Sequence, residues 1–190
     1  MIDNLIRKSQ FFLKSVSNLH VTSKDDSDKK NIVYMTDSMQ KAINIDNVKL
    51  AYSNQHFPNQ NTSYRSVDAI VQTEQTVYFI EFKNGKLCGE ERARIREKIS
   101  NSILLFSDIL GITFSNFRNE CVFILVYNKE KNSLPQPSQQ RIAEFVNKRS
   151  ENAECRFDFD KLKPFLVHDV KTYTREEFED FLEKQDFLQY

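Results

Sequence analysis

Residues 67–83 of this chain read VDAIVQTEQTVYFIEFK. Two β-prone runs, Val67–Gln72 and Val77–Lys83, flank a short polar interruption, and this pattern predicts a β-hairpin. Most positions in both runs are apolar, as in a strand that is covered on both faces. The hairpin is therefore expected at the centre of a sheet, where a charged side chain needs a compensating partner.

Three charged residues break the apolar pattern of this hairpin. A turn centred in the polar interruption pairs Ile70 with Phe79 and sets Asp68 opposite Glu81. Lys83 follows Glu81 by two residues, so strand alternation places their side chains on one face. Two carboxylates that face each other destabilise a sheet unless a cation lies between them. Oxygen ligands of this kind suit Mg²⁺ or Mn²⁺, which activate water for attack on a phosphodiester.

These residues carry a resemblance to a known family. Asp68, followed after about a dozen residues by Glu81-Phe82-Lys83 at the end of an apolar strand and then by a long helix, resembles the core of the PD-(D/E)XK nuclease superfamily. The resemblance covers about residues 31–128. Val67 stands where the family name has proline, at a position that varies widely. The motif is short, and its strand-turn-strand-helix context provides its specificity.

The resemblance implies both a fold and a set of roles. The fold is an α/β restriction-endonuclease-like core, with a central mixed sheet flanked by helices. Asp68 and Glu81 would hold Mg²⁺ or Mn²⁺ together with the backbone carbonyl of Phe82. Lys83 would orient or deprotonate the attacking water, and its charge would help to offset the charge that develops on phosphorus.

The helix predicted at residues 90–110 supplies candidate phosphate ligands. Its apolar stripe consists of Ile95, Ile99, Ile103, Phe106 and Leu110. At one hundred degrees per residue, Arg92 lies within this stripe and Arg96 at its border, while Arg94 points away and Lys98 lies on the far flank. Arg92 and Arg96 are therefore expected to face the acids and bind phosphate, although pairing with nearby glutamates is equally compatible with the pattern.

The residues on either side of the hairpin are further candidates for substrate contacts. The segment 53–66 is rich in Asn, Gln and Ser and is predicted to be a loop beside the site. Arg65, at its end, and Lys86, in the turn after the second strand, are expected to bind substrate. His56 in this loop fits a general base, but a lone histidine in a polar loop is more often an exposed residue.

Hydrophobic periodicity predicts the other elements. Before the hairpin, we expect helices at about residues 3–19 and 31–43 and a strand at 46–52. After it, we expect a parallel strand at 121–127 with the 90–110 helix as crossover, a helix at 138–148, a strand at 156–159 and a capped helix at 174–184. In the resembled family, the helix before the hairpin often lends an acid to the metal. Asp37 is the only acid inside the 31–43 helix, but it lies off the apolar stripe, and Asp46 is expected in a turn.

Composition limits the classes of function. A length of 190 residues favours a single domain spanning 1–190, and 27 basic against 27 acidic residues leave no net charge. Nucleic acid would therefore have to bind a local basic patch. No stretch reaches the length of a membrane span, and the first residues lack the order of a signal peptide, so a cytoplasmic protein is expected. The three cysteines, Cys88, Cys121 and Cys155, show no zinc spacing.

The sequence leaves two classes of function open. One is a Mg²⁺- or Mn²⁺-dependent nuclease, with DNA favoured over RNA as its substrate. The other is a non-catalytic immunity or regulatory protein on the same scaffold, which the zero net charge and the many aromatic residues favour. A homodimer or a protein partner is compatible with both. A purely structural interpretation also exists, in which Glu81 and Lys83 form a surface ion pair on an edge strand.

Overall fold

The predicted hairpin forms the centre of the sheet. The computed structural model describes residues 2–60, 64–132 and 157–190. In it, β5 (Ala69–Gln72) and β6 (Val77–Lys83) pair antiparallel in the predicted register. The next position in this register sets Asp68 level with Glu81, and the Asp68 N–H still donates to the Ile80 carbonyl at 3.1 Å. Every residue of the two strands except Lys83 is buried, which confirms a central hairpin and excludes the edge-strand interpretation.

A helical crossover extends the sheet beyond the hairpin, as the sequence predicts. The helix α5 (Gly89–Leu110) ends at Gly111, whose φ of 64° is the left-handed conformation that favours glycine after a helix. After α6 (Phe114–Glu120), the chain enters β7 (Cys121–Tyr127), which pairs parallel with β6. A further strand, β8 (Asp169–Thr174), pairs parallel with β7 and was not predicted.

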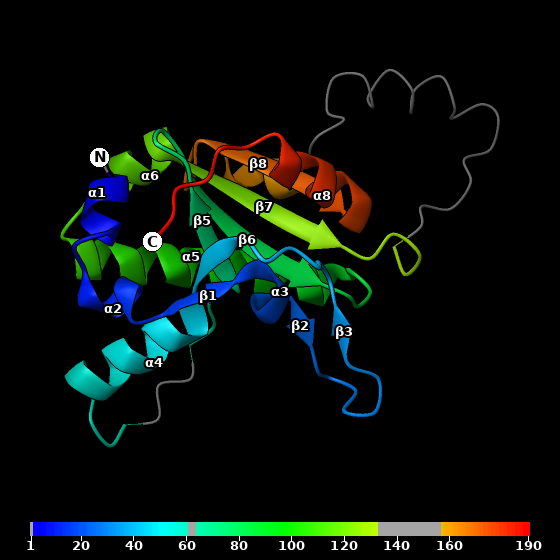
Figure 1. Ribbon diagram of the computed structural model, residues 1–190, viewed down its shortest axis with the longest axis horizontal. Coiled ribbons are helices and arrows are strands. Elements are labelled where there is room, and N and C mark those ends of the chain that lie inside the picture. The colour runs from blue at the N-terminus through cyan, green and yellow to red at the C-terminus, as the bar shows by residue number, and fades with distance from the viewer. Residues whose placement is uncertain (1, 61–63, 133–156) are drawn as a thin grey trace.

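The described residues thus form an α/β structure around a six-stranded mixed sheet of order β1-β4-β5-β6-β7-β8 (Figure 1). Because side chains alternate along a strand, the sheet has two hydrophobic cores. Ile70 and Phe79 pack with α5 residues on one face, while Val71 and Ile80 pack on the other face with Phe178 of the C-terminal helix. Asp68, Glu81 and Lys83 share the parity of Ile70 and Phe79. All three residues therefore belong to the α5 face.

The N-terminal segment is not the predicted helix 3–19. It contains α1 (Ile2–Ile6), α2 (Gln10–Leu13), β1 (Val16–Asn18) and α3 (Leu19–Thr22). The strand β1 forms because residues 16–18 pair with β4 at the sheet edge. The Asn18 side chain then accepts from the Val21 N–H at 2.8 Å and caps α3. Tertiary pairing and a cap signal therefore override the apolar periodicity.

The predicted helix 31–43 and strand 46–52 are also wrong. The structure has β2 (Lys24–Asp25) paired with β3 (Val33–Tyr34), then β4 (Lys41–Asn44) and α4 (Ile45–His56). Ile32 and Met39 belong to the presumed apolar stripe, but they are 47% and 69% exposed. The helix begins after Asn44, whose side chain accepts from the Asn47 N–H at 3.0 Å. The predicted loop 53–66 therefore starts with the last turn of α4.

In the C-terminal part, one predicted element is confirmed and another is wrong. Thr174 and Glu177 form the predicted capping box, and α8 (Arg175–Glu183) follows it. The strand predicted at 156–159 is absent from the described residues 157–159, because Phe157 and Asp158 have φ values of 67° and 60° and a 3-10 helix (Phe159–Leu162) follows. The helix predicted at 138–148 lies outside the described residues. No helix of the described part is both long and apolar enough to cross a membrane.

Candidate active site

The two acids of the hairpin lie side by side at the end of the sheet centre. The backbone N–H of Phe82 donates to Asp68 Oδ2 at 2.7 Å, which fixes the Asp68 carboxylate against β6. The Glu81 side chain is 3% exposed, and the Asp68 side chain is 21% exposed. The predicted juxtaposition of the two carboxylates is therefore present.

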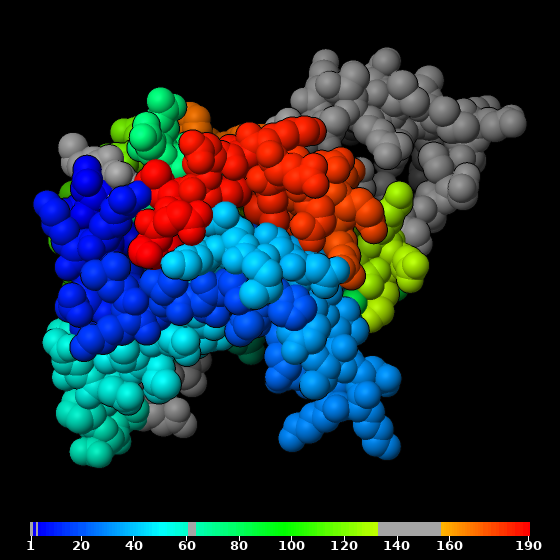
Figure 2. Space-filling model, viewed as in Figure 1, coloured from blue at the N-terminus to red at the C-terminus, as the bar shows by residue number. Residues whose placement is uncertain are grey.

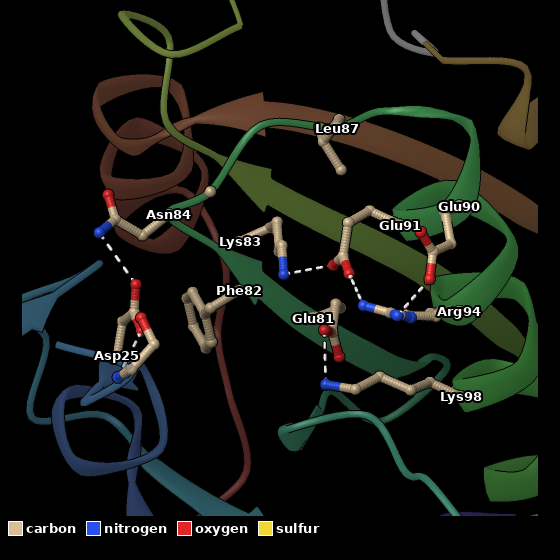
Figure 3. A network of polar contacts seen from close by, with 12 residues as sticks. Asp25, Glu81, Phe82, Lys83, Asn84, Leu87, Glu90, Glu91, Arg94 and Lys98 are labelled. Atoms are coloured by element: carbon tan, nitrogen blue, oxygen red, sulfur yellow. Dashed lines mark hydrogen bonds and ion pairs between the residues drawn. The ribbon is translucent and has the colours of Figure 1, made fainter.

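The cation between these acids is Lys98. Its ammonium donates to Glu81 Oε1 at 2.6 Å (Figure 3). It also donates to Asp68 Oδ1 at 3.2 Å. The prediction that Lys98 lies on the far flank of the helix is wrong, because the inner face of α5 is wider than its apolar stripe. Ser102, one turn further on, is fully buried, and its hydroxyl accepts from the Val67 N–H at 3.0 Å. Lys98 and Ser102 thus form a polar row on the side of α5 that packs on the hairpin.

Lys83 pairs with a different acid. Its amine forms an ion pair with Glu91, which also binds Arg94 at 2.6 Å; Arg94 in turn contacts Glu90 (Figure 3). The Lys83 side chain is 28% exposed and lines the same cleft as the acids. The structure therefore keeps Lys83 at the cleft, but gives the place beside the carboxylates to Lys98.

The electrostatics of the acid pair show that it is incompletely neutralised. Burial, and then the neighbouring Asp68 charge, raise the pKa of Glu81 well above its ordinary value, although Lys98 acts in the opposite direction. Burial also raises the pKa of Asp68. Burial alone would lower the pKa of Lys98, but its contacts with Glu81 and Asp68 raise it. Glu81 Oε2 is buried and accepts no hydrogen bond from the described residues, so one acceptor of the pair is unfilled.

The stability of the protein should depend on pH through Glu81. The pKa of Glu81 in the folded state lies above the unfolded value of 4.5, so the folded state binds more protons. The contribution of Glu81 to the free energy of unfolding is therefore fully present below pH 4.5 and is lost as the pH rises through the folded pKa. Each tenfold difference in proton affinity between the folded and unfolded states corresponds to about 1.4 kcal/mol.

Glu81→Gln removes this titration, so its unfolding free energy should increase relative to wild type as the pH rises. Urea unfolding of both proteins in chelator, over a pH series, measures this difference. A difference that is constant with pH would contradict the raised pKa of Glu81.

A third acid lies at the start of the helix that precedes the hairpin. That helix is α4, and its acid is Asp46, whose Oδ1 accepts from Lys49 at 2.5 Å and from Ser66 at 2.9 Å. The Asp46 charge adds to the effect of burial in raising the pKa of Asp68. The prediction of a turn at Asp46 is wrong, and the signal that identifies the helix is the preceding Asn44 cap. Asp37 is exposed and pairs with Arg175, away from the acids.

The arginines predicted to bind phosphate lie elsewhere. Arg92 donates to Asp158 Oδ2 at 3.3 Å, and Arg96 donates to the Asp158 carbonyl at 3.3 Å while its guanidinium lies 5.3 Å from the centre of the Phe159 ring. Both side chains therefore hold the segment that enters the 3-10 helix and do not face the acids. Arg65 and Lys86 are exposed, and their role in substrate binding stays a prediction. His56 stacks on Tyr52 with ring centres 4.4 Å apart.

The acids open into a cleft of about 250 Å³. One wall is the β2–β3 hairpin, which extends away from the body of the protein (Figure 2). Asn84, after β6, donates to Asp25 Oδ2 of β2 at 2.9 Å and ties this wall to the sheet. The cleft is lined by Ser23, Lys24, Asp25, Ser27, Met35, Asp68, Glu81, Phe82, Lys83, Asn84, Gly85 and Lys98.

The side chains of the site can be compared with the ligands that a metal ion requires. In the described ranges, no group of three or more His, Cys, Asp and Glu side chains is arranged to hold an ion. The pair Asp68 and Glu81 still fits Mg²⁺, which keeps several waters and is often bound through one or two carboxylates. The buried, unfilled Glu81 Oε2 supports this fit. Of the described cysteines, Cys121 is buried and Cys88 is exposed, and neither forms a disulfide.

Comparison with known proteins gives no relative: no protein-family model, no curated protein and no solved structure matches this chain.

Proposed function

We propose that this protein is a metal-dependent nuclease with a restriction-endonuclease-like core. The observation that carries the proposal is the buried pair Asp68 and Glu81, set together at the end of a central hairpin and incompletely neutralised. The arrangement of the chain supports it, since an antiparallel hairpin is followed by a long helix and a parallel strand. These are the elements that the resemblance to the PD-(D/E)XK superfamily implies.

Asp68 and Glu81 would hold Mg²⁺ or Mn²⁺ with the backbone carbonyl of Phe82, and the bound ion would supply a polarised water and charge stabilisation. The protein's own contribution is to place the donors. The Phe82 N–H orients Asp68, and burial keeps the Glu81 carboxylate largely out of bulk solvent. Lys98 is the lysine within reach of the acids and is the proposed partner of the reacting phosphate. Lys83 would assist at the wall of the cleft.

The substrate is proposed to be nucleic acid, with DNA favoured over RNA. The test is incubation of the purified protein with plasmid, linear duplex, single-stranded DNA and RNA, each with Mg²⁺, Mn²⁺ or chelator. The proposal expects cleavage of at least one substrate that chelator abolishes. Absence of cleavage across the whole panel would contradict it.

One observation favours the alternative, a non-catalytic interaction protein. Lys98 already contacts both acids, and such an ion-pair network can serve a structural purpose alone. The same panel separates the two functions, because an interaction protein would cleave nothing with either metal.

Arg92 and Arg96 provide a prediction about substrate binding. Because both contact Asp158, replacing both by alanine should leave the salt dependence of nucleic-acid affinity unchanged. The measurement is the affinity for a short duplex in Ca²⁺ across a salt series, with Arg65→Ala and Lys86→Ala as comparison variants. A flatter salt slope in the Arg92/Arg96 variant would return these arginines to the phosphate-binding surface.

A further inference from the structure

Lys98 occupies the position between the acids that a bound cation requires. Its ammonium lies within hydrogen-bond distance of both carboxylates, at 2.6 Å from Glu81 and 3.2 Å from Asp68. A second cation placed between the same oxygens would meet a like charge at close range. A metal ion and the Lys98 ammonium would therefore compete for one position.

The helix that carries Lys98 is fixed, but its amine is not enclosed. Ser102 bonds to the backbone on both sides, as its hydroxyl donates to the Lys98 carbonyl at 2.8 Å and accepts from the Val67 N–H at 3.0 Å. These bonds hold α5 against the hairpin, so displacement of the amine must come from rotation of the side chain. That side chain is 25% exposed and lines the cleft, so its amine can turn toward an anion there.

We infer that Lys98 is a built-in counter-ion that exchanges between the acid pair and a substrate phosphate. This inference rests on the proposed function. In the free protein, Lys98 neutralises part of the charge of Asp68 and Glu81 and weakens metal binding. When nucleic acid enters the cleft, the ammonium transfers to a phosphate oxygen, and the acids become available to the metal. Metal and nucleic acid then bind cooperatively, each strengthening the other by the same factor.

The test measures binding of Mn²⁺ alone to the intact chain, without nucleic acid and at pH 8. Lys98→Gln removes the competing charge and keeps a polar side chain, so it should bind Mn²⁺ at least about tenfold more tightly than wild type. Lys83→Gln is the matched control, because it removes the same charge from the same cleft. Lys83 contacts Glu91 and acts on Glu81 only through space, so the Mn²⁺ affinity of this variant should change by less than about threefold. Adding Glu81→Gln to Lys98→Gln should abolish the tight binding.

The second measurement is the coupling between ligands. In wild type, Ca²⁺ should bind more tightly when a short oligonucleotide is present, and Lys98→Gln should lose this increase. If the variant fails to fold, wild type alone still tests the inference: the Lys98 ammonium resonance should change on adding Mg²⁺.

Equal Mn²⁺ affinity in wild type and Lys98→Gln would overturn the inference that Lys98 exchanges between the acids and a phosphate. A Lys98 resonance that Mg²⁺ does not perturb would do the same. Such a result alongside metal-dependent cleavage would leave the nuclease function intact. Tighter Mn²⁺ binding by Lys98→Gln in a protein that cleaves nothing would support the competition but not the nuclease function.

Discussion

Glu81→Gln is expected to reduce metal-dependent cleavage by at least about a hundredfold while the protein remains folded. Changes to groups that merely support a metal ligand already cost about ten- to a hundredfold, so loss of a ligand's charge should cost at least as much. The fold should survive, because the amide keeps the shape of the side chain and removes like-charge repulsion from Asp68. Initial rates of cleavage and urea unfolding of both proteins measure these effects.

Glu91→Gln is the matched control for this variant. Glu91 is also a glutamate near the cleft, but it contacts Lys83 and Arg94 instead of the acid pair. Its replacement should lower the rate by less than about tenfold, within the usual effect of a partly exposed ion pair. Wild-type rates in Glu81→Gln, together with a normal metal requirement, would show that the chemistry resides elsewhere.

The second large effect concerns the two lysines. Lys98→Gln should lower kcat by about a hundredfold, within the range of a group that acts directly on the reacting atoms, because Lys98 is the only one of the two that contacts the acids. Lys83→Gln should lower it by less than about tenfold. Single-turnover rates at saturating Mn²⁺ make this comparison, since the tighter metal binding expected of Lys98→Gln then does not contribute.

If Lys83→Gln were inactive and Lys98→Gln nearly as active as wild type, Lys83 would be the catalytic lysine, as the sequence motif predicts. Lys98 would then be a structural counter-ion only. The two variants thus show whether the catalytic lysine is the one predicted by the motif or the one that contacts the acids.

The elements that local pattern predicts correctly are those in which local and tertiary preferences agree. The hairpin register follows from the alternation of side chains along the strands and from the position of the turn. The apolar stripe of α5 is long enough to indicate a helix and not a strand. The capping box at Thr174 places the last helix for a similar reason. In residues 31–43, helical spacing arises by coincidence, since Ile32 and Met39 do not enter the core.

The candidate site is predictable only in part, because some of its contacts depend on tertiary structure and not on local pattern. Strand alternation alone brings Asp68 to Glu81, because the geometry of a paired strand is fixed. Lys98 escapes detection because a stripe defined by apolar residues omits the polar residues that a helix buries beside a charged partner. The contacts of Arg92 and Arg96 depend on Asp158, which is distant in sequence and follows no local pattern.

The position of a bound metal shows whether Asp68 and Glu81 form a metal site. Crystals of the wild-type protein grown with a short oligonucleotide and Mn²⁺ allow the anomalous scattering of the ion to be mapped. We expect a Mn²⁺ peak bound by the carboxylates of Asp68 and Glu81, with the Lys98 amine moved onto a phosphate. An acid pair still bridged by Lys98, with no Mn²⁺ beside it, would show that these carboxylates do not form a metal site.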